Sequence, residues 1–437
     1  MRTPHYEPGG FAVSLEDLQY YLETAEVARE DYPAFVHEWC HYLQDIATIS
    51  AQNGFYLWLR DVICLTKITC ASTGQEIHLP LKPEDYGGYV NKHKRLYGRY
   101  CEEIKECSIN DPKITAPYNI EVISTKEFTE DERVYARCFC YINGEEYVLS
   151  LVALQEINAY YAQKIAEEHL EGVEYRLKAD DNVTYPYHLG DILFDEYKVT
   201  CDIKMRFCIT FMCLDTLQPP VIFLKALEHL EGQNLDYAKS DDILKVVQVI
   251  AELTKQYAHS NEEAYREIFK DYNQWLADPS HQCMVTALKW YVEKINRAIE
   301  TNRQGAQIIP VMVCENKKSL CKIYWDYKIP LFKIDGIVTP DSKTDQQEAL
   351  ATMTFWMLKK VCALLVSQTR EHIMQYSQCP FLNHCQYKED VDKEYDCYSA
   401  YWAILENETK TKCPFGIVLH TMGLWQNKLV VDEDRLD

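Results

Sequence analysis

The sequence predicts an α+β fold, with a mainly helical core, an inserted small antiparallel β-sheet and a cysteine-containing C-terminal region. Three observations predict it: long stretches with apolar residues at helical spacing, a cluster of β-prone runs between two of them, and a late group of cysteines. With 437 residues, 47% of them apolar, the chain can form two or three domains. We expect an N-terminal segment at 1–66 and an insertion at 67–148. A helical segment at 149–325 and a C-terminal region at 326–437 should follow.

The first predicted helix contains the sequence DYPAFVHEWCHYLQD. Asp31 can cap its N-terminus, and Pro33 suits its first turn, where no backbone N–H is needed. Apolar residues then recur close to a 3.6-residue period, and no Gly or Pro follows before Gly54. His37 and His41 therefore lie on one face of the helix, one turn apart.

The pattern His-Glu-x-x-His on a helix is typical of catalytic zinc sites. His37 and His41 can bind one zinc ion, and Glu38 beside them can take a proton from a zinc-bound water. Gln44 shares the face of His37. The alternative is an ordinary buried helix, in which unpartnered histidines beside a carboxylate would be energetically costly. The pattern therefore predicts a metal site.

A second predicted helix, residues 149–170, offers a third ligand. Glu156 stands there among apolar neighbours at helical spacing. A carboxylate in such surroundings must be paired with a cation or bound to a metal. We expect Glu156 to bind zinc, and the alternative is a salt bridge to a Lys or Arg. His169 points away from this face, and Asp191 and Asp215 are weaker rivals in less clear contexts.

The His-Glu-x-x-His motif resembles that of the zinc metallopeptidases called zincins. The metzincin branch continues the motif with Gly and His at the positions of Gln44 and Ala47 in this chain. The gluzincin branch instead takes a Glu from a downstream helix, and this chain is similar to that branch. The resemblance implies a zincin-like core with one catalytic zinc ion and an open position for water. Its ligands and general base would be His37, His41, Glu156 and Glu38.

The two predicted metal helices are separated by an insertion, because 114 residues lie between His41 and Glu156. The gap is longer than in the best-known gluzincins. Asn143-Gly144 lies between two β-prone runs, which is a strong hairpin signal. The other elements expected in the insertion are two extended runs around a Gly-containing turn at 67–81, a helix near 91–107 and a strand at 119–124.

The middle of the chain, residues 190–305, shows helical spacing and capping residues and is expected to be scaffold. The stretch before it, YPYHLGDILF, contains groups that could stabilise an oxyanion formed during amide hydrolysis. We name His188 as the catalytic candidate there, with Tyr185 and Tyr187 as alternatives. Asn158 and Tyr160 are close enough in sequence to the third ligand to support it.

The C-terminal region contains four cysteines in a loose C-x5-C-x11-C-x15-C spacing, with His384 beside the second cysteine. Four thiolates, or three and the histidine, could hold a second, structural zinc ion, and the same ligands could hold an iron–sulfur cluster. The alternative is buried or free thiols, because eighteen cysteines are spread along the chain. The four are Cys379, Cys385, Cys397 and Cys413.

The net charge of −22 argues against nucleic-acid binding, because a phosphate backbone would be repelled. The N-terminus lacks the apolar core of a signal peptide, and the longest apolar runs are too short to span a bilayer. We therefore expect a cytoplasmic protein without a membrane segment and with reduced thiols.

The sequence as a whole predicts a zinc-dependent metallopeptidase of narrow specificity that cleaves a protein or peptide substrate. One alternative is a pseudopeptidase or interaction protein that keeps a structural metal. Another is a zinc hydrolase acting on a non-peptide amide, since the motif alone does not separate these reactions.

Overall fold

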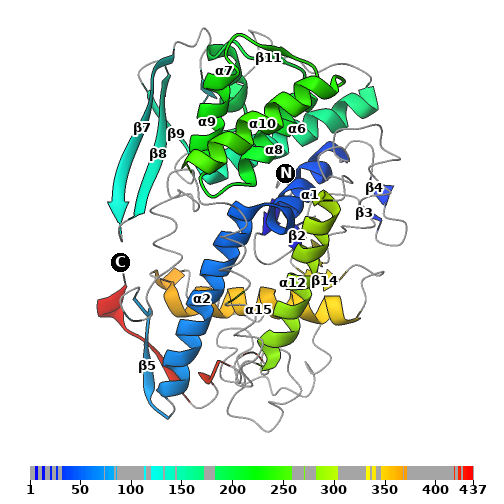
Figure 1. The fold of residues 1–437 in the computed structure, drawn as a ribbon. Coiled ribbons are helices and arrows are strands. Elements are labelled where there is room, and N and C mark those ends of the chain that lie inside the picture. The colour runs from blue at the N-terminus through cyan, green and yellow to red at the C-terminus, as the bar shows by residue number, and fades with distance from the viewer. Residues whose placement is uncertain are drawn as a thin grey trace.

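Two successive helices, α1 (Tyr32–Ala47) and α2 (Ile49–Ala71), run through the middle of the computed structural model (Figure 1). Most of the described chain is helical. The structure describes residues 5–7, 12–14, 20–21, 26–27, 32–72, 74–82, 85, 113–114, 120–130, 133–142, 145–171, 183–257, 270, 282–303, 331–334, 337–340, 346–367, 369–371, 418, 422–424 and 427–436. Among these residues no helix is long and apolar enough to cross a membrane.

The helix that contains His-Glu-x-x-His ends at Ala47, well before Gly54. Thr48 is extended, with φ −110° and ψ 139°, and its hydroxyl donates to the Gln44 carbonyl at 2.8 Å. The next helix starts against another part of the chain, because the Ile49 N–H donates to the Asp215 carboxylate at 3.0 Å. A distant carboxylate at the end of helix α8 (Ile203–Leu214) thus caps the start of α2 and separates it from α1.

A group of five helices covers one side of α1 and forms the upper part of Figure 1. Helix α1 packs on α6, and α6 packs on α8. Helix α6 matches the helix expected at 149–170, and the other four lie in the region expected to be helical from about residue 190. Helix α9 begins at Pro219, although Pro219-Pro220 favours a break with the next helix starting at Phe223; proline is tolerated in the first turn. The five are α6 (Leu151–Glu171), α7 (Leu189–Glu196), α8 (Ile203–Leu214), α9 (Pro219–His229) and α10 (Ser240–Tyr257).

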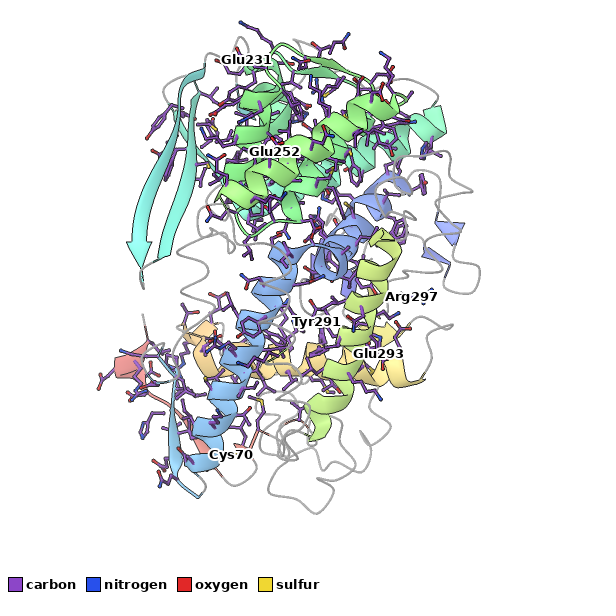
Figure 2. All side chains as sticks on the ribbon, in the orientation of Figure 1. Cys70, Glu231, Glu252, Tyr291, Glu293 and Arg297 are labelled. Atoms are coloured by element: carbon purple, nitrogen blue, oxygen red, sulfur yellow. The ribbon has the colours of Figure 1, made fainter. Side chains whose placement is uncertain are left out.

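The lower part of the molecule is built on α2, α12 (Gln282–Arg303) and α15 (Gln346–Val366). Tyr291, labelled in Figure 2, lies on α12 between these helices. Its ring lies 4.0 Å from that of Phe55 on α2, centroid to centroid, and 6.2 Å from that of Phe355 on α15. Its hydroxyl donates to the Asp45 carbonyl at 3.3 Å, so this aromatic core also contacts the end of α1.

The predicted small antiparallel sheet is present, in the order β7-β8-β9. The hairpin at Asn143-Gly144 is confirmed, because Ile142 pairs with Glu145 across it. The strand expected at 119–124 is the start of β7. Ser150 follows the last strand and accepts a hydrogen bond from the Ala153 N–H at 3.1 Å, so the sheet leads directly into α6. The strands are β7 (Ile120–Glu130), β8 (Arg133–Ile142) and β9 (Glu145–Leu149).

The expectation of two extended runs at 67–81 is wrong for the first run, because α2 continues to Ala71. The β-branched residues there favour a strand locally, but Thr66 and Thr69 donate to the carbonyls of Val62 and Leu65 and lie on a buried face. Packing of that face outweighs local propensity. Only β5 (Glu76–Leu79) is a strand, and it pairs in parallel with β15 (Lys428–Val431), not with the inserted sheet.

A four-stranded mixed sheet, unforeseen from the sequence, joins the start of the chain to residues 331–340. Its order is β1-β2-β13-β14, with β2 and β13 parallel. Tyr6 and Val13 from its first two strands are buried in the core. The strands are β1 (His5–Glu7), β2 (Ala12–Ser14), β13 (Leu331–Ile334) and β14 (Ile337–Pro340). The helix expected near 91–107 lies outside the described residues.

The cap at the start of α2 predicts a pH dependence of stability. Burial raises the pKa of Asp215 to about 7. As the pH rises from about 4 to 7, the unfolded chain loses this proton while the folded chain keeps it. The free energy of unfolding should therefore fall across this range, by at most about 4 kcal/mol.

Asp215→Asn retains an acceptor for the Ile49 N–H but cannot ionise. Urea unfolding from pH 4 to 7 should show a flatter profile than that of the wild type. The exposed Asp241→Asn change on α10 is the control. The same slope in Asp215→Asn and wild type would contradict the prediction.

Candidate metal centre

Helix α1 presents its two motif histidines toward each other. The Nε2 atoms of His37 and His41 are 3.3 Å apart, and the two rings meet edge to face with centroids 4.9 Å apart. This follows from their spacing of one helical turn. Both side chains are mostly buried, so their ring nitrogens need polar partners.

Helix α6 brings Glu156 to the same point. Its two carboxylate oxygens lie 3.3 Å from His37 Nε2 and 3.4 Å from His41 Nε2. Among the residues that the structure describes, this is the one group of three or more His, Cys, Asp or Glu side chains that could hold a metal ion. The three predicted ligands, far apart in the chain, therefore lie together.

The separations between the three side chains fit a zinc ion. Ligands about 2.0–2.1 Å from a tetrahedral zinc ion lie about 3.3–3.4 Å from one another. The two imidazole Nε2 atoms lie 3.3 Å apart, and each faces a different oxygen of Glu156, at 3.3 Å for His37 and 3.4 Å for His41. Taken as one ligand atom per residue, the three groups lie within 4.8 Å of one another. Two imidazole nitrogens and a carboxylate oxygen also form a donor set that zinc accepts, and it leaves a fourth position open.

In the metal-free chain, the triad pairs a histidine proton with the Glu156 carboxylate, and a bound metal ion would take the place of that proton. Burial raises the pKa of Glu156, but His41 and His37 outweigh it and hold that pKa well below its ordinary value. Burial lowers the pKa of His41, but the charge of Glu156 and the hydrogen bond that His41 donates to it raise the pKa to about 9. Burial lowers the pKa of His37, and Glu156 offsets this only in part. The triad thus keeps a positive charge beside a carboxylate.

The motif glutamate lies next to the triad and is 7% exposed. Burial raises the pKa of Glu38 to about 8, and the charge of Glu156 acts in the same direction. His41 and a hydrogen bond from the Tyr6 backbone lower it. The ring of Tyr6 stacks on that of His41 at 6.5 Å, and its hydroxyl donates to Asp45 at 3.0 Å. Strand β1 therefore lies against the site.

Histidine 188 is near the triad but is engaged with a tyrosine. It caps α7, and its Nε2 lies 3.0 Å from the hydroxyl of Tyr160, one turn after Glu156 on α6. The ring of Tyr187 lies 6.0 Å from that of His37 and 5.8 Å from that of Tyr160. The partner of His188 is therefore Tyr160, a residue that the sequence indicated only by its proximity to Glu156.

The two aspartates considered as rival ligands have other partners. Asp191 is fully buried and bonds to Arg206 and to the Tyr161 hydroxyl, the latter at 3.1 Å. Asp215 caps α2, as described above. The other proposed metal site, made by Cys379, Cys385, Cys397 and Cys413, lies outside the described residues, as does His384.

No protein-family model, no curated protein and no solved structure significantly matches this chain. The case for a metal centre therefore rests on the geometry and charge of the triad itself.

Replacing both His37 and His41 by Ala should remove one bound metal ion per chain, because two of three ligands are lost. Elemental analysis after dialysis against zinc measures this. His169→Ala, which changes another histidine on α6, is the control and should keep the metal. Unchanged metal content in the double variant would contradict the site, and an additional ion retained in all variants would be bound elsewhere.

The start of α7 packs so tightly on α6 that only glycine fits at position 190. A Cβ atom on Gly190 would lie 2.5 Å from the Tyr161 hydroxyl and 2.6 Å from Ile157 Cγ2. Gly190→Ala should lower the free energy of unfolding by about 1–3 kcal/mol. Because α7 carries His188 but no triad ligand, zinc affinity should stay unchanged. Urea unfolding and zinc titration test both parts, and undiminished stability would contradict the packing argument.

Proposed function

We propose that the protein is a zinc-dependent metallopeptidase of gluzincin-like type. The observation that carries the proposal is the convergence of the His37, His41 and Glu156 side chains at one point, with Glu38 beside them. A site that only stabilised the fold would not need this additional buried carboxylate. The presence of Glu38 therefore favours catalysis over a structural metal.

A zinc ion held there would lower the pKa of a coordinated water and polarise the scissile carbonyl. Glu38 would take the proton of the attacking water on a carboxylate oxygen and pass it to the leaving amine. Burial suits Glu38 to this task, because a raised pKa brings a carboxylate closer to the neutral pH at which proton transfer in both directions is efficient.

Tyr160 and His188 are proposed as donors toward the oxygen of the substrate carbonyl, where negative charge develops. Their mutual hydrogen bond of 3.0 Å orients both side chains. Tyr160 shares helix α6 with Glu156, and Gly190 holds the start of α7 against that helix. The pair thus keeps a fixed relation to the triad.

We propose a protein or peptide as the substrate, cleaved with narrow specificity. Replacing Glu38 by Gln should leave zinc bound and lower the cleavage rate by about 10²–10⁴-fold, because the proton acceptor is lost. A proteome-derived peptide library, analysed by mass spectrometry with zinc-loaded protein, reveals cleavage without knowledge of the sequence preference. Asp61→Asn, another buried acid-to-amide change, is the control on α2.

Two outcomes would contradict the peptidase, and a third would contradict only the role of Glu38. Zinc-loaded wild type that cleaves no peptide in the library but hydrolyses small amides would indicate the non-peptide hydrolase. Absence of both activities, with zinc stoichiometrically bound, would favour the interaction protein with a structural metal. Cleavage by Glu38→Gln at the wild-type rate would exclude Glu38 as the base.

A further inference from the structure

A buried glutamine connects a proposed ligand to the neighbouring helix. The Oε1 atom of Gln44 lies 2.9 Å from Nδ1 of His41, on the side of the ring away from Glu156. The Nε2 atom of Gln44 donates to Asn158 Oδ1 at 2.9 Å and to the Gln155 carbonyl at 3.0 Å. Gln44 is fully buried, so these contacts replace water entirely.

Asn158, also fully buried, extends the connection to α8. Its amide nitrogen donates to the Phe207 carbonyl at 3.1 Å and to the Thr210 hydroxyl at 2.9 Å. A backbone carbonyl can only accept a hydrogen bond. The NH2 group of Asn158 must therefore face Phe207, and its oxygen must face Gln44.

The orientation of each group determines that of the next. Since Asn158 presents an oxygen, Gln44 must present its NH2 group to it, and the Gln155 carbonyl requires the same orientation. The oxygen of Gln44 then faces His41. Nδ1 of His41 therefore carries a proton, and the nitrogen that can give up its proton to a metal ion is Nε2, the atom that faces His37 and Glu156.

We propose that Gln44 and Asn158 are positioning residues that hold His41 in the Nδ1–H tautomer for metal binding at Nε2. We call the path from His41 through Gln44 and Asn158 to the Phe207 carbonyl the amide relay. The inference rests on the proposed zinc site. The relay is directional: a backbone carbonyl on α8 sets the protonation of a ligand on α1, with no contact between the two.

The relay explains why two polar amides are buried between α1 and α6. Each has partners on both sides, so the desolvation of each is compensated. An outer hydrogen bond to a ligand histidine typically raises metal affinity by about 10–100-fold. His37 differs from His41, because no buried amide among the residues that the structure describes accepts a close hydrogen bond from its Nδ1 atom; the Gln163 side chain lies nearby and raises the pKa of His37 slightly.

Gln44→Met keeps the length of the side chain and removes its polarity. Zinc affinity, measured by competition with a chromophoric chelator, should fall about 10–100-fold. Gln52→Met is the matched control: Gln52 is a buried glutamine on α2 that donates to the Ile46 carbonyl and touches no ligand. It should leave zinc affinity unchanged, although it also removes a buried amide.

Asn158→Leu tests the direction of the relay. It should weaken zinc binding in the wild type, but should weaken it no further in Gln44→Met, where the relay is already interrupted. Nitrogen-15 spectra of histidine in the metal-free protein, at a pH above the pKa of His41, should show His41 with its proton on Nδ1. A purely structural role would not specify this tautomer.

Three results would overturn the inference. Folded Gln44→Met with wild-type zinc affinity excludes Gln44 as a positioning residue. A His41 proton on Nε2 excludes the tautomer, and an undiminished effect of Asn158→Leu in the Gln44→Met background excludes the relay. Wild type that binds no zinc overturns the proposed function together with this inference, whereas the other three results overturn the inference alone.

Discussion

The contact between α1 and α6 contains buried polar groups, each of which needs a hydrogen-bond or ionic partner. Two imidazoles and two amides meet a carboxylate there in a largely dry environment. Each is stable only while its partners stay in place, because an unpaired buried polar group costs more than a hydrogen bond contributes. Apolar packing has no such direction. The relative register of the two helices is therefore fixed by polar pairing, and the surrounding helices pack on that arrangement.

The grouping of the three proposed ligands could be predicted from the sequence, whereas much of the structure that supports them could not. Helical periodicity places His37 and His41 on one face, and a carboxylate among apolar residues indicates a need for a partner. The hairpin at Asn143-Gly144 follows from local turn chemistry. No local sequence signal predicts that the Tyr6 backbone contacts Glu38, or that Asp215 caps the start of α2. Those features depend on contacts between distant segments, as does the continuation of α2, where burial outweighs β-propensity.

The centre is assembled from segments with different roles. Helices α1 and α6 supply the proposed ligands, β1 covers Glu38, α7 carries His188, and α8 anchors the amide relay. Side chains on rigid elements hold their geometry better than side chains on loops. Helix α1 alone would lack the carboxylate of Glu156 and the strand that covers Glu38. The chemistry we propose is therefore a property of the folded chain rather than of the motif.

The arrangement of the triad in the folded chain links the stability of the protein to the concentration of free metal ions. The three side chains lie close enough together to hold one metal ion, yet 114 residues separate His41 from Glu156 in the chain. An unfolded chain cannot present them together, so a metal ion bound by the triad selects the native state. At a free concentration about 1,000 times the dissociation constant, mass action adds roughly 4 kcal/mol to the free energy of unfolding. The supply of metal would then govern how much folded protein a cell retains.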